Sequence, residues 1–166
     1  MELHDILQPC LRVGSGETSS VYRNGKGLVV KDMTGGNPEY IIREGDLQQA
    51  VAKMTQLVPK VRGVLGGRFL LMDDVGDSEK ITDLVVAKRG AQTVLVALKQ
   101  AGIRHNDLSP PNLIIKSNTP HVVDFGWARW SYEDAFEGWP SDDVAILGAL
   151  DHMVKSPNKK WDWSAL

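Results

Sequence analysis

Short apolar runs alternate with glycine-containing breaks in the first third of the chain, a pattern that is typical of β-strands joined by turns. The runs predict five strands, at residues 11–13, 21–23, 28–31, 61–65 and 68–72. Asn24-Gly25 favours a hairpin, because both central residues of a two-residue turn adopt positive φ. Gly66-Gly67 joins the last two strands. We therefore expect a β-rich N-terminal region.

One helix interrupts these strands. We expect it to begin with Asn37 as its N-cap and Pro38 in its first turn, and to run to about Gln56. Its most regular stripe, in steps of four, three, four and three, is Tyr40, Glu44, Leu47, Val51 and Met54. One carboxylate therefore shares the apolar face. Because an unpaired buried carboxylate is strongly destabilising, the pattern predicts that this glutamate contacts a cation.

The remainder of the chain reads mainly as helices. Its periodicity predicts three helices and two short strands, at 81–88, 91–100 and 142–154 and at 113–115 and 121–123. Gly102 fits just past the second helix, and Ser141 is a candidate cap for the third. Ser117-Asn118 provides the turn between the two strands.

These patterns together predict an α+β fold in a single domain. A polar connector follows residue 72, and the character of the chain changes there from β-rich to helical. We expect a β-rich N-lobe at 1–72, a hinge at 73–76 and a mostly helical, small C-lobe at 77–166.

Composition and charge narrow the function classes. The 166 residues are 42% hydrophobic, enough to fill one core or two small lobes. A net charge of −2 with scattered basic residues argues against direct nucleic-acid binding. Cys10 is a single thiol, so a reducing cytoplasm fits best. We expect no membrane association, because no run approaches the roughly 20 apolar residues of a span and the start lacks signal-peptide character.

The candidate chemistry lies at 105–112 and 124–126, where the chain reads HNDLSPPN and DFG. Phosphoryl transfer from ATP uses hard oxygen ligands for Mg²⁺ and a carboxylate beside the attacking hydroxyl. Asp107, Asn112 and Asp124 supply groups of this kind. Either motif alone occurs by chance, but the two in this order, with apolar strands between them, are a strong signal.

These segments resemble the catalytic loop and the magnesium-binding motif of protein kinases. The resemblance covers roughly residues 11–150. It implies a bilobal protein-kinase-like fold, ATP and Mg²⁺ as cofactors, Asp107 as catalytic base, and Asn112 and Asp124 as metal ligands.

GSGETSSV at 14–21 resembles the glycine-rich loop that covers the ATP phosphates, with Ser19 in place of the third glycine. Ser19 either crowds that loop or donates its hydroxyl to phosphate. The resemblance implies nucleotide contacts from Gly14, Ser15, Gly16, Ser19 and Val21. A G-x-G sequence between strands is otherwise usually only a turn.

Val29-Val30-Lys31 resembles the strand whose lysine contacts the α- and β-phosphates in kinases, where a glutamate on the next helix pairs with that lysine. Glu44 is the expected partner, which gives Lys31 and Glu44 catalytic roles. Glu39 is the competing candidate, but the helix dipole already explains an acid so near the helix start.

Residues 69–76 resemble the last N-lobe strand of a kinase running into the hinge. The resemblance implies that adenine bonds to the backbone near Asp73 and Val75, with Met72 as gatekeeper, although methionine there also fits plain core packing. Asp143 resembles the residue that braces the catalytic loop, and a helix-start aspartate is an equal explanation. His105 is expected to pack near the DFG segment.

Four departures from the kinase pattern place the chain among atypical members. Asn106 replaces the H-R-D arginine, and Ser109 replaces a lysine, as in RIO-type, small tRNA-modification-associated, lipopolysaccharide and aminoglycoside kinases. No A-P-E motif is present, and the C-lobe is small. So small a C-lobe indicates completion by a second copy or a partner protein. The core-filling interpretation is favoured for Trp127 and Trp130 over an exposed aromatic patch.

Three functions remain open. The first is transfer of phosphate to a protein Ser/Thr hydroxyl, including autophosphorylation. The second is phosphorylation of a small-molecule hydroxyl, on a sugar or an antibiotic. The third is a non-catalytic nucleotide-binding scaffold. The retained set of Lys31, Glu44, Asp107, Asn112 and Asp124 favours an enzyme.

Overall fold

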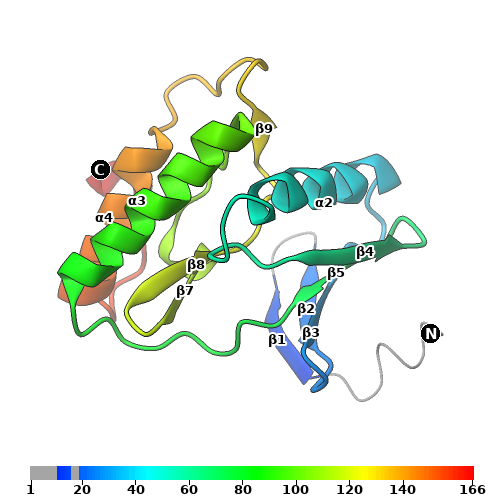
Figure 1. Ribbon diagram of the computed structural model, residues 1–166, viewed down its shortest axis with the longest axis horizontal. Helices are drawn as coiled ribbons and strands as arrows, with labels where there is room; N and C mark the ends of the chain where they lie inside the picture. Colours follow the sequence, from blue (N-terminus) through cyan, green and yellow to red (C-terminus); the bar gives the residue numbers. More distant parts are fainter. Residues whose placement is uncertain (1–10, 16–18) are drawn as a thin grey trace.

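The N-terminal part of the protein is a five-stranded antiparallel sheet (Figure 1). The structure, a computed structural model, describes residues 11–15 and 19–166. The sheet has the order β1-β2-β3-β5-β4, with strands β1 (Leu11–Ser15), β2 (Ser20–Arg23), β3 (Leu28–Asp32), β5 (Phe69–Asp73) and β4 (Val61–Leu65). All five predicted strands are therefore present, with ends shifted by up to two residues.

The hairpin between β2 and β3 forms as predicted, but its turn is not the expected two-residue type. Four residues connect the strands, with positive φ at Gly25 (72°) and Gly27 (89°). Asn24 is not among the residues with positive φ; it is buried, and its Oδ1 accepts hydrogen bonds from the N–H groups of Lys26 and Leu28. The asparagine side chain thus organises the loop from inside, because it can bond to backbone two residues on.

Helix α2 (Pro38–Ala52) covers one face of the sheet. Asn37 caps it, accepting a bond from the N–H of Glu39 at 3.0 Å. The helix ends four residues before the predicted Gln56, and Tyr40 and Met54 are exposed rather than part of the buried stripe. The buried face is broader than the predicted stripe, because α2 contacts both the sheet strands β4 and β5 and the helix α3. Its buried residues are Ile41, Glu44, Gly45, Leu47, Gln48, Val51 and Ala52.

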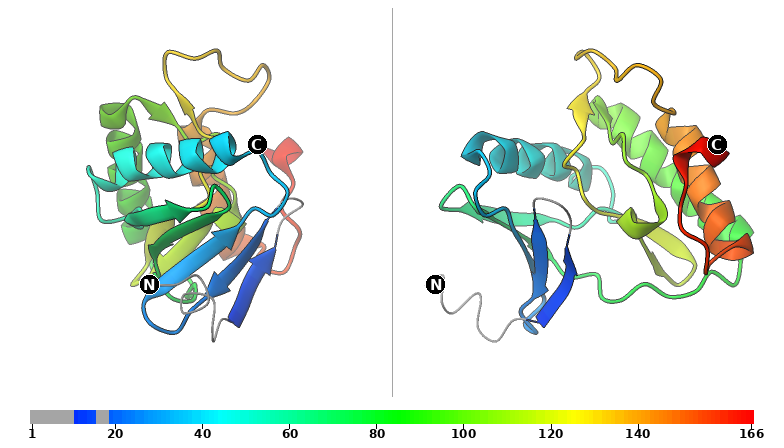
Figure 2. Two further views of the ribbon diagram at one scale, coloured as in Figure 1. Left: turned by 90° about the vertical axis from the view of Figure 1, so that its right-hand side faces the viewer. Right: turned by 180° about the vertical axis from the view of Figure 1, so that it is seen from behind.

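The C-terminal part contains α3 (Leu84–Ala101) and α4 (Asp142–Lys155), which lie side by side (Figure 2). One continuous α3 replaces the two predicted helices. Gly90 falls between the two predicted ranges and lies where β8 packs on the helix: a Cβ there would be 2.8 Å from Pro120 Cδ. The glycine therefore permits close contact rather than ending the helix. Gly102 terminates α3 with φ 70°, as predicted.

Short elements complete this part. They comprise two β-pairs, β6–β9 and β7–β8, and two 3₁₀ turns, with bounds β6 (Ile103–Arg104), β7 (Leu113–Lys116), β8 (Thr119–Val122), β9 (Arg129–Trp130), η1 (Pro110–Asn112) and η2 (Trp163–Ala165). The predicted Ser117-Asn118 turn joins β7 to β8, with φ of 50° and 63°. No helix in the described ranges is both long and apolar enough to cross a membrane.

The largest hydrophobic core joins α2 to the C-terminal elements. Leu47 and Val51 of α2 pack with residues of α3, α4, β7 and β8 in one buried cluster. Ile41 instead packs with Leu70 and Met72 of the sheet. The α+β class is therefore confirmed, and α2 is the element that both parts share.

The tryptophans only partly follow the prediction. Trp130 is partly buried and packs against the main core, as expected. Trp127 is 53% exposed, so the core-filling prediction was wrong for it. It lies beside Phe136 and Trp139, with ring centroids 6.0 and 5.4 Å away. Trp127 therefore belongs to an aromatic group at the surface, because its aromatic neighbours are Phe136 and the exposed Trp139 and not residues of the core.

Candidate functional site

Lys31 and Glu44 form a buried ion pair. Alternation along β3 turns Lys31 toward α2, and its Nζ lies 2.7 Å from Glu44 Oε1. The two side chains are only 8% and 3% exposed. The predicted contact of Glu44 with a cation is confirmed. Glu39 is exposed in the first turn of α2 and is not the partner.

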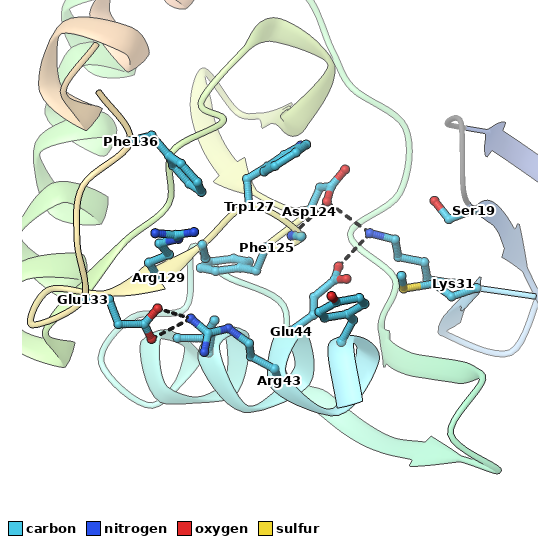
Figure 3. Close-up of a pocket in the computed structure, with 15 residues that line it drawn as sticks. Ser19, Lys31, Arg43, Glu44, Asp124, Phe125, Trp127, Arg129, Glu133 and Phe136 are labelled. Carbon is cyan, nitrogen blue, oxygen red and sulfur yellow. Dashed lines mark hydrogen bonds and ion pairs between the residues drawn. The ribbon is translucent and has the colours of Figure 1, made fainter. Parts of the chain in front are cut away.

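Asp124 brings a second carboxylate to the same lysine (Figure 3). Its Oδ1 accepts bonds from Lys31 Nζ and from the N–H of Gly126, each at 3.1 Å. Asp124 has φ 61°, an uncommon conformation for a non-glycine residue. Gly126 leaves room for the cluster, since a Cβ there would be 3.1 Å from Asp124 Oδ1 and 3.7 Å from Glu44 Oε2.

His105 anchors the loop before Asp107. It is fully buried, its ring lies edge-on to Phe125 at 4.7 Å, and its Nε2 is 3.0 Å from the carbonyl oxygen of Val123. The N–H of Asp107 donates to Nδ1 at 3.1 Å, so Nε2 carries the proton of a neutral ring. Burial lowers the pKa of His105, which agrees with this assignment. The predicted packing against the DFG segment is confirmed.

Asp107 and Asn112 form the second half of the site. Asn112 Nδ2 donates to the backbone oxygen of Asp107 at 2.8 Å and to its Oδ2 at 2.9 Å. The N–H of Val123 donates to the carbonyl of Asn112 at 3.0 Å, which ties this loop to the residue before Asp124. Five residues that are scattered along the sequence thus lie in two bonded groups, connected by β8 and its continuation.

The residue that braces the loop is Asp142, not Asp143. Asp142 accepts bonds from the N–H groups of His105 at 2.8 Å and Asn106 at 3.0 Å. Asp143 is exposed at the start of α4, where it interacts with Ser141. Of the two equal interpretations of Asp143, the helix-start one is confirmed, and the bracing role belongs to the residue before it. Two adjacent aspartates follow Ser141, and only the direction of α4 decides which one faces the loop.

Asn106 bonds the loop before Asp107 to the segment after Gly126. Its φ is 71°, which asparagine accepts more readily than most residues. Its Nδ2 donates to the carbonyl of Trp127 at 3.0 Å and so links the loop to the segment after DFG. Asn106 and Asp124 both adopt positive φ at the site, in agreement with the tendency of backbone strain to collect at functional positions.

The carboxylates have separated pKa values. Burial raises the pKa of Asp107 to about 6, and the nearby charge of Asp124 adds to the shift. Burial alone would also raise the pKa of Asp124, but Lys31 and the Gly126 N–H outweigh it and hold the pKa below its usual value. Burial raises the pKa of Glu44, against the pull of Lys31. The pKa of Lys31 is raised, since two carboxylates outweigh its burial.

The donor set suits a small hard cation. Asn112 directs its Nδ2 toward Asp107, which leaves Oδ1 as the coordinating atom, and Asp124 contributes a carboxylate. Amide and carboxylate oxygens are the ligands that Mg²⁺ prefers. In the described part of the chain no group of three or more His, Cys, Asp or Glu is arranged to hold a metal ion. A Mg²⁺ held by Asn112 and Asp124 therefore needs further oxygen ligands, such as phosphates and water.

A cavity of about 820 Å³ opens beside the lysine. Ser19, Lys31, Glu44 and Asp124 line one side of it, and residues of α2 and of the segment after DFG line the rest. Its lining includes neither Asp107 nor the hinge residues. The cavity thus reaches the Lys31 cluster from the α2 side.

The remaining predicted nucleotide contacts are placed as follows. Gly14 and Ser15 are the last residues of β1, and Gly16 lies outside the described residues. Val21 pairs with Lys31 across β2 and β3. Ser19 lines the cavity. A nucleotide role for Gly14, Ser15, Gly16 and Val21 stays a prediction.

The hinge residues lie at the end of β5. Met72 is buried against Ile41 and Leu70, and its Sδ accepts a bond from Gln48 Nε2 at 3.5 Å. Asp73 donates its N–H to Lys60, and Val75 is partly buried. Met72 therefore has a core-packing function, and adenine contacts at Asp73 and Val75 stay predictions.

The sequence did not predict the contacts that Glu133 makes with Arg43 and Arg104. They join α2, β6 and the segment after β9 through side chains that carry no motif. Only their charges were visible in the sequence, and charge alone does not identify a partner 90 residues away.

No model of a known protein family matches this chain, and a search of curated proteins found no match either. Interpretation of the site therefore depends on the residues and contacts given above.

Proposed function

We propose that this chain is an ATP- and Mg²⁺-dependent kinase with a bilobal protein-kinase-like fold. The observation that carries the proposal is the position of Lys31 Nζ, between Glu44 at 2.7 Å and Asp124 at 3.1 Å. Kinases require a strand lysine paired with a glutamate of the following helix, together with a DFG aspartate that is free to bind Mg²⁺, and Lys31, Glu44 and Asp124 supply these three groups. The bonded Asp107–Asn112 pair supports the same interpretation.

Each residue has a defined part in the reaction. Lys31, positioned by Glu44, orients the phosphates of ATP. Asn112 and Asp124 hold Mg²⁺, which neutralises charge on the phosphate oxygens. Asp107 orients the acceptor hydroxyl and takes its proton as the oxygen bonds to the γ-phosphorus and the bond to the β-phosphate oxygen breaks, releasing ADP.

The acceptor in this proposal is a serine or threonine hydroxyl of a protein, this chain included. The pKa of Asp107, raised to about 6, supports its part, because a base of that pKa is ionised at neutral pH and still accepts a proton readily. Adenine bonds to the backbone near Asp73 and Val75, and the strand ends around Ser19 cover the phosphates.

The test is incubation of the purified chain with ATP labelled at the γ-phosphate and Mg²⁺, alone and with a cell lysate, alongside an Asp107→Asn variant. Label that appears on protein with the parent chain and is absent with the variant supports the proposal. Label on a small molecule identifies a small-molecule kinase instead.

Absence of any transferred label, together with nucleotide binding measured by calorimetry, would identify a nucleotide-binding scaffold. Equal transfer by the parent chain and by Asp107→Asn would exclude the proposed base. These outcomes separate the three functions that the sequence leaves open.

A further inference from the structure

One ion pair joins α2 to the segment that follows β9. Arg43 Nη2 lies 2.6 Å from both carboxylate oxygens of Glu133, although the two residues are 90 positions apart. The pair lies at the rim of the cavity beside Lys31 (Figure 3). Arg43 immediately precedes Glu44 on α2, so the helix directs one side chain to this segment and the next to the lysine.

The same segment is bound to the strand that leads into the catalytic loop. Arg104 donates from Nη2 to the carbonyl of Glu133 and from Nη1 to the carbonyl of Ser131. The N–H of Ser131 donates to Gly102 at 2.7 Å. Arg104 precedes His105 directly. Residues 131–133 thus contact α2 through a side chain and β6 through the backbone.

The two halves of α2 are held differently. Its second half buries Leu47, Val51 and Ala52 in the main core. Its first half buries Ile41 against the sheet, while Tyr40 and Ile42 are exposed. Glu44 lies between the halves, so its position depends on how well the first half is fixed. The Arg43–Glu133 pair adds a contact from this half to the segment after β9.

We propose that Arg43 and Glu133 form a positioning pair that keeps Glu44 on Lys31 and couples α2 to the catalytic loop through Arg104. The catalytic purpose of this coupling rests on the proposed kinase function, whereas the coupling itself is a property of the folded chain. The Arg43–Glu133 pair forms without a phosphorylated residue, because the carboxylate of Glu133 already provides the negative charge that Arg43 contacts. The Arg43 hydrogen bond holds the pKa of Glu133 low, so that charge is present at neutral pH.

The experiment measures the reactivity of Lys31 in the nucleotide-free protein. An N-hydroxysuccinimide acetate reagent acylates the amines that it can reach, and mass spectrometry of the peptide that contains Lys31 gives the rate at pH 8. Lys31 should react slowly, because its side chain is only 8% exposed and its amine is held by Glu44 at 2.7 Å and by Asp124 at 3.1 Å. We expect Glu133→Gln to accelerate labelling of Lys31 about two- to fivefold, as loss of a partly exposed ion pair implies.

Arg62→Gln is the matched control. It breaks an Arg–Asp pair with contacts of 2.6 and 2.9 Å on β4 and β5, away from residues 131–133. It should leave labelling unchanged, and Glu44→Gln sets the upper limit of the effect. A Glu133→Gln rate equal to that of Arg62→Gln would overturn the proposal.

A charge-reversed double variant covers the case in which a single variant folds poorly. Arg43→Glu combined with Glu133→Arg restores the pair, so labelling of Lys31 should return to within about twofold of the parent rate. A double variant that labels as fast as Glu44→Gln would overturn the proposal. Because labelling needs no ATP, these results stand whether or not phosphate transfer is found. If transfer is found, kcat/KM for ATP should fall about two- to fivefold in Glu133→Gln and recover in the double variant.

Discussion

Asp107 and Asp124 are two carboxylates of one site with opposite electrostatic surroundings. Asp124 accepts from the cation of Lys31 and from the N–H of Gly126, and its pKa is lowered. Among the side chains of residues 19–166, Asp107 accepts from the neutral amide of Asn112 alone, and burial raises its pKa to about 6. The pKa values of the two residues differ because of the groups they bond to, more than because of how deeply they are buried.

This separation assigns the roles within the proposed reaction. A carboxylate that stays ionised suits a permanent contact with a cation, whereas one with a raised pKa suits proton transfer. The two roles follow from where Lys31 lies, because it bonds to Asp124 and reaches Asp107 only as a weaker, more distant charge. Substitution of either carboxylate, or of Lys31, should therefore have a distinct effect.

The largest effect is expected from Asp107→Asn. Removing the proton acceptor should lower kcat by roughly 10²- to 10⁴-fold, while the affinity for ATP changes by less than about threefold. Steady-state kinetics and calorimetry measure the two quantities. Asp46→Asn, at an exposed position of α2, is the matched control and should change neither. A kcat within tenfold of the parent value would remove Asp107 from its proposed part.

Lys31→Met should lower the free energy of unfolding at pH 8 by about 3 kcal/mol, since it leaves the Glu44 carboxylate buried without its cation. The loss should shrink at pH 5, because burial raises the pKa of Glu44 and the residue then takes up a proton. Urea unfolding at the two pH values measures this difference.

Two control variants test whether the stability loss in Lys31→Met comes from the unpaired charge of Glu44. Lys26→Met removes an exposed lysine of the β2–β3 connection and should have little effect. Lys31→Met combined with Glu44→Leu should recover part of the stability, because no charge is then left unpaired. An equal loss at pH 5 and pH 8 in Lys31→Met would show that packing, not charge, dominates.

The pH dependence of phosphate transfer tests the raised pKa directly. The proposed reaction requires ionised Asp107, so kcat/KM should fall about tenfold per pH unit below a midpoint near pH 6. Initial rates between about pH 4.5 and about pH 8, a range that includes the expected transition with a margin on both sides, locate the midpoint. A midpoint at the ordinary aspartate value would mean that burial does not act on Asp107 as the structure indicates.

The smallest effect is a gain in stability from Asp107→Asn. The pKa of Asp107 is raised in the folded state, so its contribution to stability is full below the unfolded value and is lost as the pH rises through about 6. At pH 8 the ionised side chain is unfavourable, and the neutral variant should be more stable by about 1 kcal/mol, after allowance for solvent screening. At pH 4 the difference should nearly vanish. Thermal unfolding at the two pH values measures it, and a destabilised variant at pH 8 would contradict the sign.

The fold was largely predictable from local patterns. Short apolar runs between glycine-containing breaks located every strand of the five-stranded sheet, and capping residues located the starts of α2 and α4 and the end of α3. The errors arose where distant contacts override local signals. Gly90 lies inside α3, where β8 packs against it. Tyr40 is exposed because the face of α2 that packs against its neighbours includes Ile41 and not Tyr40.

The site was predictable in its residues but not in its bonds. The inward position of Glu44 followed from helical periodicity, and the lysine contact confirms it. The choice between Asp142 and Asp143 did not follow, since it depends on the direction of α4 relative to the loop. The contacts of Arg43 and Arg104 with Glu133 were likewise out of reach, because charges on the surface of a helix or strand have many possible partners.

The sequence by itself determined the α+β class, the order of the elements and the polar residues of the candidate site, because periodicity and turn chemistry act between neighbours along the chain. Only the tertiary structure decided which carboxylate meets Lys31, which aspartate braces the loop and how α2 is held at Glu133. Ion pairing and desolvation depend on atoms that are distant in sequence. The difference in pKa between Asp107 and Asp124 therefore appears only when β3, α2 and the two loops are brought together.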